Sequence, residues 1–254
     1  MKVSIITLSF NSKDTLQDTI TSVTNQSYKK IEHIIIDGKS NDGTIDIINK
    51  NKKHFSKIII EKDYGIYDAM NKGLKAATGD IIGFLNSDDC FYDKNALEKI
   101  VLSFNSPEIL YSYGNLAYVE RNNLNSNIRF WRSNYISSND LLNSKIPAHP
   151  TFYFKSKIRN KLGYFNTHYR LASDYDYMLR CILLYPLNGA YVDSTLIKMR
   201  LGGATSKDFK NIFKQNIEIL KILKNSGLKF NPLKYFTYKI FDRISQYRNR
   251  NKLK

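Results

Sequence analysis

The sequence predicts an α/β fold with a mostly parallel sheet that is covered by helices on both faces. Over the first hundred residues, short β-branched apolar runs alternate with segments whose apolar residues recur at helical spacing. The runs are apolar on both faces, which is typical of strands buried on two sides. With 254 residues, 42% of them hydrophobic, the chain is long enough for one such domain with a sizeable core.

The first half supplies four predicted strands and four predicted helices. The strands are expected at residues 3–9, 31–36, 58–60 and 81–85. Asn11 or Ser12 is expected to cap the first helix, and Thr44 the second. The apolar helix faces are Leu16, Ile20 and Val23; Ile45 and Ile48; Ile66, Met70 and Leu74; and Leu97, Ile100, Val101 and Phe104.

The second half is less regular. A strand is expected at 110–120, followed by a polar turn, and another strand at 190–199. Between them, a helix is expected to follow Ser173, with Met178, Cys181, Ile182 and Tyr185 on its apolar face.

Residues 207–254 differ in charge from the rest of the chain. They carry 13 Lys and Arg against 3 Asp and Glu, so this tail holds +10 of the net +16. Its spacing predicts two amphipathic helices, the second starting at Pro232. Two interpretations remain open: a basic helix lying in the plane of a membrane, or a terminal helix packed on its own domain.

Several features bear on the compartment. No apolar run approaches the roughly 20 residues of a spanning helix, and the N-terminal stretch is typical of a first buried strand rather than a signal peptide. Cys90 and Cys181 have neither disulfide-framework nor metal spacing, so we expect free thiols in a reducing cytosol.

Polar side chains follow all four predicted strands of the first half. Since ligands of open α/β sheets bind at the carboxyl ends of the strands, these groups are expected to converge. They are Thr7, Ser9 and Asn11; Asp37; Asp63, Tyr67, Asp68, Asn71 and Lys72; and Asn86, Asp88 and Asp89.

The chemistry of these groups favours a hard cation. Carboxylates gathered with Asn and Ser oxygens suit Mn²⁺ or Mg²⁺, and the absence of a His or Cys cluster argues against zinc. Such a cation is commonly held by one or two carboxylates plus a phosphate, which predicts a diphosphate ligand. Asp37 and Asp63 are then available to a base or a ribose.

The segments SIITLSFN, IIIDGKSNDGT, DYGIYDAMNKGLKAATGD and GFLNSDD resemble the signatures of inverting family 2 glycosyltransferases with a GT-A fold. GIYDAMNKG is similar to bacterial enzymes that extend lipid-linked O-antigen or capsule repeat units. The resemblance implies a Rossmann-like mixed sheet flanked by helices, with residues 1–206 as catalytic domain. Within it, 1–109 would bind the nucleotide-sugar and 110–206 the acceptor, and 207–254 would be a helical tail.

The resemblance also implies the nucleotide site. Thr7 and Ser9 match positions that flank the nucleotide, Asp37 the acid that binds uracil, and Asp63 a second uridine-side acid. Lys72 would reach the diphosphate.

The segment NSDD stands at the family's Asp-x-Asp metal motif, with Asn86 in place of the first acid. Asp88 and Asp89 remain for the ribose and the metal, and the resemblance does not decide which takes which.

Asp174 matches the family's general base, with Ser173 in place of the preceding Glu; the alternative is that these residues only cap a helix. Asp176 is the rival carboxylate on the acceptor side, turned about 200° from Asp174 on a helix. His149, in HPTF, is either an acceptor contact or structural. Arg200, which could pair with a phosphate of the nucleotide, opens the segment RLGGATS. This segment either closes over the diphosphate or is a glycine turn ending the domain.

These inferences predict a metal-dependent hexosyltransferase. It would use a UDP-sugar, with UDP-glucose favoured by family likeness, and form a β-bond with inversion on a polyprenyl-diphosphate-linked sugar. The setting would be O-antigen or capsule synthesis at the inner face of the cytoplasmic membrane, with the tail on anionic lipid. The alternatives are a nucleic-acid-binding protein that uses the basic tail and a sugar-nucleotidyltransferase, which would want a Gly-rich loop after the first strand. TLSFNSKDT has no glycine there.

Overall fold

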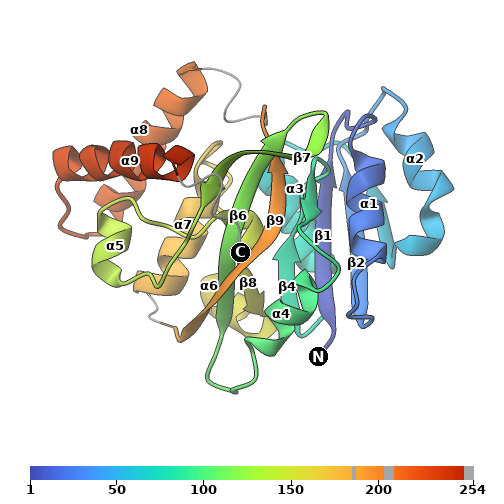
Figure 1. Cartoon of the computed structure of the whole chain (residues 1–254), viewed down its shortest axis with the longest axis horizontal. Coiled ribbons are helices and arrows are strands. Elements are labelled where there is room, and N and C mark those ends of the chain that lie inside the picture. Colours follow the sequence, from blue (N-terminus) through green and yellow to red (C-terminus); the bar gives the residue numbers. More distant parts are fainter. Residues whose placement is uncertain (185–186, 203–208, 249–254) are drawn as a thin grey trace.

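A computed structural model describes residues 1–184, 187–202 and 209–248. Its described part is built around one mixed sheet flanked by helices (Figure 1). The strand order is β3-β2-β1-β4-β8-β6-β9-β5, with β7 paired to β6 outside this path. The strands are β1 (Val3–Ser9), β2 (Ile31–Asp37), β3 (Lys57–Ile60), β4 (Ile81–Phe84), β5 (Asp89–Phe91), β6 (Tyr111–Glu120), β7 (Asn123–Trp131), β8 (Tyr153–Lys155) and β9 (Gly189–Arg200).

The first four strands in sequence are parallel, as predicted. In β1 all seven residues are buried, and it pairs with β2 on one side and β4 on the other. The register places Ser9 opposite Asp37, so the carboxyl ends of β1 and β2 meet at one edge.

The remaining strands make the sheet mixed. Strand β8 is antiparallel to β4 and β6, whereas β9 is parallel to β6. The short strand β5 pairs antiparallel with the end of β9, with Asp89 opposite Met199. The end of β9 is thereby joined to the NSDD segment.

Helices cover both faces of the sheet. Side chains of α3, α7 and α8 share one buried cluster with the sheet, and those of α1, α2 and α4 pack on the other face. The helices are α1 (Leu16–Thr24), α2 (Thr44–Lys50), α3 (Ile66–Ala76), α4 (Ala96–Leu102), α5 (Ser138–Leu142), α6 (Arg159–Leu162), α7 (Ser173–Leu179), α8 (Phe209–Asn225) and α9 (Pro232–Arg248).

Both predicted helix caps are wrong. Helix α1 begins at Leu16 because the Ser12 carbonyl first closes a turn with the amides of Thr15 and Leu16. The N-cap of α2 is Gly43 at φ +100°, a left-handed conformation that glycine adopts without strain. Thr44 is the first helical residue, where its amide and hydroxyl both donate to the Asp42 carboxylate.

Two further details differ from expectation. Ile66 begins α3 but is exposed, whereas Tyr67, Met70 and Leu74 of the same helix are buried. Helix α4 ends at Leu102, although Phe104 is still buried with its apolar face. Cys90 and Cys181 are both free, as predicted, and both are buried.

The tail forms α8 and α9, on the side of the molecule opposite α1 and α2 (Figure 1). Helix α9 packs on β7, and α8 contacts α7. The Glu218 carboxylate of α8 accepts hydrogen bonds from the amides of Arg170 and Leu171, just before α7. Among the described residues, no helix has the length and apolar character needed to cross a bilayer.

Candidate active site

The carboxyl ends of β1 and β2 are held together by one buried carboxylate. Asp37 is fully buried at the end of β2 and accepts hydrogen bonds from the hydroxyls of Ser9 and Ser40, both at 2.7 Å, and from the Ser40 amide at 2.8 Å. These bonds compensate the cost of burying its charge. Ser9 and Asp37 are therefore brought together as predicted, with their side chains bonded to each other.

A surface cradle lies beside them. Phe10 follows β1 with its ring largely exposed. A Cβ on Gly38 would lie 2.6 Å from Asp63 Oδ2 and 3.1 Å from a Phe10 ring carbon. The lack of a side chain at position 38 thus keeps a carboxylate and an exposed aromatic ring side by side. This arrangement can offer a ring face and a hydrogen-bond acceptor to a planar base.

Thr7 and Lys72 are directed elsewhere. The Thr7 hydroxyl is buried and lies 2.9 Å from Nε2 of His33, inside the sheet. Lys72 Nζ lies 3.1 Å from Glu61 and 3.3 Å from Asp68 and donates to the Lys62 carbonyl at 2.7 Å. It would have to leave these acids to reach a diphosphate.

The segment from the end of β4 to the start of β5 carries unsatisfied buried acceptors. Asn86 Oδ1 and Asp89 Oδ1 are both buried without a hydrogen-bond partner among the described residues, although Asn86 Nδ2 lies 3.4 Å from Asp89 Oδ2. Burial, and next the neighbouring Asp88 charge, raise the pKa of Asp89 well above its usual range. One carboxylate oxygen and one amide oxygen left without partners are costly unless a cation or a donor meets them.

These residues fit a hard divalent cation held partly by its ligand. The described residues contain no cluster of three or more His, Cys, Asp or Glu side chains that could hold a metal alone. Two adjacent carboxylates and one amide oxygen are the kind of incomplete oxygen set that a phosphate completes. Asp88 and Asp89, predicted as the metal and ribose ligands, are therefore at a chemically suitable position.

Arg200 holds the main chain of the NSDD segment in place. Its guanidinium is buried and donates to the Asp88 carbonyl at 3.0 Å and the Arg121 carbonyl at 2.9 Å, and it forms an ion pair with Asp18. The side chain thus fixes the main chain of the NSDD segment instead of facing solvent. The predicted mobile segment RLGGATS continues into residues 203–206, which lie outside the described residues.

Asp174 lies in the first turn of α7 and is contacted from α3. The Tyr67 hydroxyl donates to Asp174 Oδ1 at 2.9 Å, across 107 residues of sequence. Ser173, which precedes Asp174, is fully buried and its Oγ has no partner among the described residues. The hydroxyl of Ser173 is therefore not used as a cap, and α7 has no side-chain cap hydrogen bond.

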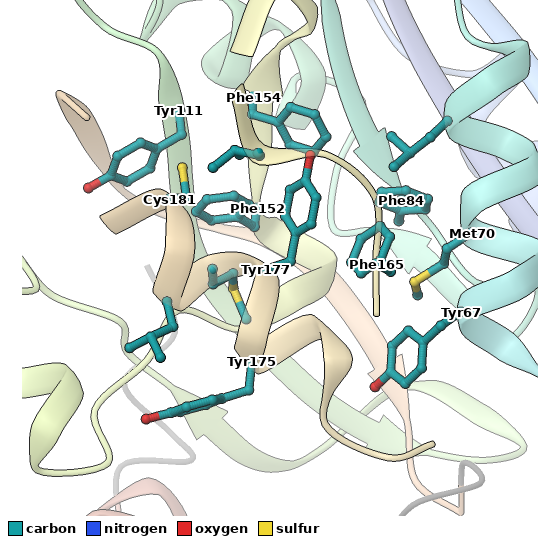
Figure 2. Close-up of a cluster of buried hydrophobic side chains, with 14 of the residues drawn as sticks. Tyr67, Met70, Phe84, Tyr111, Phe152, Phe154, Phe165, Tyr175, Tyr177 and Cys181 are labelled. Atoms are coloured by element: carbon teal, nitrogen blue, oxygen red, sulfur yellow. The ribbon is translucent and has the colours of Figure 1, made fainter. Parts of the chain in front are cut away.

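An aromatic cluster joins Asp174 to the sheet edge. Figure 2 shows Phe165 between Phe84, the last residue of β4, and Tyr67. Phe165 packs edge-on to Phe84 at 5.4 Å between ring centroids and is stacked with Tyr67 at 6.0 Å. His149 stacks on Phe84 at 5.5 Å; burial lowers its pKa, while the Asp174 charge opposes that shift. The predicted base and acceptor-side histidine are thus neighbours beside the end of β4.

Asp176 faces away from this cluster. Its carboxylate pairs with Arg180 at 2.9 Å, and that guanidinium also donates to the Tyr164 carbonyl. The side chains of Asp174 and Asp176 therefore point in different directions, as predicted. Asp176 is engaged by Arg180, which in turn binds the loop at Tyr164.

Sequence reasoning missed Phe10 as a member of the site. Phe10 had a usable signal, since a large ring directly after a fully buried strand, in a polar stretch, is exposed for a reason. Tyr67 was among the strand-end groups expected to converge, but its bond to Asp174 had no signal in the sequence, because the two residues are 107 positions apart.

Comparison with known proteins identifies the family of the chain. The family model described as "Glycosyl transferase family 2" matches residues 4–171. The Escherichia coli enzyme UDP-Glc:alpha-D-GlcNAc-diphosphoundecaprenol beta-1,3-glucosyltransferase WfaP is 30% identical over 234 residues, covering 89% of this chain and 87% of WfaP.

Two solved structures share the fold. TarS 1-349 of S. aureus in complex with UDP-GlcNAc superposes with a TM-score of 0.69 at 16% identity, covering 99% of this chain and 72% of TarS. The mannosyltransferase PcManGT of Pyrobaculum calidifontis, in complex with GDP-Man and Mn²⁺, gives 0.67 at 16% identity, covering 95% and 69%. The chain belongs to glycosyl transferase family 2 and is a glycosyltransferase with the GT-A fold.

Proposed function

We propose that this glycosyltransferase moves a hexose from a UDP-sugar, with inversion, to a sugar carried on a polyprenyl diphosphate. UDP-glucose is the favoured donor, because WfaP is named for UDP-Glc as donor and a diphosphoundecaprenol-linked GlcNAc as acceptor. The product would be a β-linked repeat unit of a surface polysaccharide such as O-antigen or capsule. Residues 1–206 would form the catalytic domain, and residues 207–254 the attached tail.

The observation that carries the proposal is the pair of orphaned acceptors, Asn86 Oδ1 and Asp89 Oδ1, on the loop after β4. We assign Asp88 and Asp89, with Asn86, to a divalent cation and the ribose-diphosphate of the donor. Mn²⁺ or Mg²⁺ bound there would offset the negative charge that the departing UDP acquires. Arg200 contributes indirectly, by fixing the main chain of Asp88.

The cradle beside this loop is suited to the uridine. Phe10 presents an exposed ring on which uracil can stack, and Asp63 lies against Gly38 at its edge. Asp37, fully hydrogen-bonded from Ser9 and Ser40, would shape this pocket by fixing the two strand ends.

Asp174 is suited to be the general base. The acceptor hydroxyl would lose its proton to this carboxylate as its oxygen bonds to the anomeric carbon, and the bond from that carbon to UDP would break with its electron pair going to UDP. A single direct displacement with no protein nucleophile inverts the anomeric configuration, so an α-linked UDP-sugar gives a β-bond. His149, beside Asp174, would line the acceptor side.

The tail would bring the enzyme to the lipid carrying its acceptor. The face of α9 that is turned toward the domain is mixed. Tyr235 and Phe236 pack on the buried hydrophobic cluster, whereas Gln246 is polar and buried, and burial lowers the pKa of Lys239 to about 8. Its apolar face is exposed, with side chains 47–76% accessible; these are Leu233, Ile240, Phe241, Ile244 and Tyr247.

Exposed cations flank this apolar face, at Lys234, Arg243 and Arg248. An apolar stripe bordered by positive charge fits the headgroup region of an anionic membrane. We expect the double variant Ile240→Asp, Phe241→Asp to lose binding to phosphatidylglycerol vesicles in a flotation assay. The control is Leu102→Asp, which changes an exposed apolar residue of α4. Equal vesicle binding by both variants would refute this use of α9.

The transfer reaction is tested with UDP-glucose and a synthetic GlcNAc-diphosphate lipid in the presence of Mn²⁺. We expect a β-linked disaccharide product, with Asp174→Asn reducing kcat by at least a hundredfold because a base contributes about 10²–10⁴ in rate. Glucose turnover with an α-linked product, or an unimpaired Asp174→Asn enzyme, would contradict the proposed chemistry.

A further inference from the structure

Tyr67 is fixed at its position from several directions. The hydroxyl donates to Asp174 Oδ1 at 2.9 Å, and the main-chain amides of Ser173 and Asp174 also face its oxygen. The ring is buried and stacked with Phe165 (Figure 2). The hydroxyl therefore lies at the start of α7, where it cannot turn away without disturbing the core.

The segment opposite Tyr67 is clamped by the same helix. One turn further along α3, the Asn71 amide donates to the Phe165 carbonyl and accepts from the Phe165 amide, both at 2.9 Å. Tyr67 and Asn71 together bind α3 to the chain that leads into α7. The distance between the two helices at Asp174 is thus set by hydrogen bonds from α3 as well as by packing.

The Tyr67 phenol stays protonated, and is therefore a hydrogen-bond donor, at any pH at which the enzyme is assayed. Burial, and next the Asp174 charge, raise the pKa of Tyr67 well above its usual range. Among the described residues, His149 also interacts with the Asp174 charge, but burial lowers the pKa of His149, so it is neutral near pH 7. Tyr67 is therefore the group that meets the Asp174 charge directly.

We propose that Tyr67 is the positioning residue of the general base: by holding Oδ1 of Asp174, it presents Oδ2 to the acceptor hydroxyl. This inference rests on the proposed role of Asp174. In the position before the base, the Ser173 hydroxyl has no partner in the part of the chain that the structure describes, so it does not perform this task. A donor on one oxygen favours the ionised carboxylate and fixes its plane, which are the two conditions for accepting a proton.

The test is Tyr67→Phe, which keeps the ring and removes the donor. We expect kcat to fall about tenfold, with the donor KM unchanged, because the lost bond acts on the base and not on UDP.

Tyr177→Phe is the matched control. Tyr177 belongs to the same aromatic cluster, stacked with Phe165 at 4.4 Å, but its buried hydroxyl has no partner among the described residues. Removing that hydroxyl should leave both kcat and the donor KM unchanged. If Tyr67→Phe folds poorly, 3-fluorotyrosine placed at position 67 alone serves as a second probe. Its phenol remains a hydrogen-bond donor, so kcat should be retained.

The outcomes separate this inference from the proposed function. If Asp174→Asn is inactive but Tyr67→Phe matches the control in kcat, the positioning role is wrong and the base assignment stands. If Asp174→Asn stays active, the base assignment itself fails. A Tyr67→Phe enzyme whose donor KM rises together with the fall in kcat would indicate a purely structural role and would also overturn the proposal.

Discussion

Replacing Arg200 by Met should loosen the NSDD loop and weaken nucleotide binding together. The guanidinium is 4% exposed and donates to the carbonyls of Asp88 at 3.0 Å and Arg121 at 2.9 Å. The substitution leaves both acceptors without their donor. It also breaks the ion pair with Asp18, whose side chain is 52% exposed.

The magnitude follows from these contacts. Each hydrogen bond to a charged group contributes about 1.5–3 kcal/mol, and an ion pair with a half-exposed partner adds less than about 1 kcal/mol. Packing of the Met side chain offsets part of the loss, so we expect the free energy of unfolding to fall by about 2–4 kcal/mol. For a chain of this length, Tm should fall by about 5–12 °C.

Urea unfolding followed by circular dichroism measures the loss of stability. Calorimetric titration of UDP with Mn²⁺ measures the loss of nucleotide affinity. We expect UDP affinity to fall several-fold in the folded variant, because Asp88 loses its main-chain support. Arg132→Met is the control, since Arg132 forms an exposed ion pair with Asp193 at 2.8 Å and should cost under about 1 kcal/mol. If the two variants have equal stability and unchanged UDP affinity, the support role of Arg200 is refuted.

Three further substitutions test the packing, the electrostatics and the acceptor side. Gly83→Ala would place a Cβ 2.0 Å from the Tyr153 ring in the core, so we expect the free energy of unfolding, measured with urea, to fall by about 1–3 kcal/mol or more. Burial raises the pKa of Glu32, but hydrogen bonds outweigh it and lower that pKa to about 2; the donors are Ser4, Thr78 and Lys2. The stability that ionised Glu32 contributes is present above about pH 4.5 and is lost as the pH falls toward 2. The difference in free energy of unfolding between the wild type and Glu32→Gln should therefore shrink across that pH range. Asp176→Asn breaks the pair with Arg180 and should lower Tm while leaving the acceptor KM unchanged; a higher KM with normal Tm would restore Asp176 to the acceptor site.

The fold was predictable where one local pattern determines an element. The strand Val3–Ser9 was predicted to the residue, because a β-branched run apolar on both faces has few other solutions. Strand β5 was missed because three residues beginning with an acid carry no periodic signal, and only pairing with β9 makes them a strand. The same holds for β7, a polar strand whose identity depends on β6.

The sequence indicated which residues gather at the candidate site, but not which contacts their side chains make. Strand-end logic identified Asp37, Asp63 and the NSDD segment, since parallel strands deliver their carboxyl ends to one edge. It could not show that the Lys72 ammonium is engaged by Glu61 and Asp68 or that Arg200 points inward. These outcomes depend on tertiary contacts, which leave no trace in the local sequence.

Calorimetric titration of UDP into the full chain, with Mn²⁺ and then with EDTA, tests the central claim most directly. The account predicts binding with Mn²⁺ that is lost in EDTA and is also lost in Asp89→Asn, because the orphaned Asp89 and Asn86 oxygens then lack their cation. UDP binding that is indifferent to EDTA and to Asp89→Asn would contradict the metal assignment. Absence of UDP binding in the presence of Mn²⁺ would contradict the donor site as a whole.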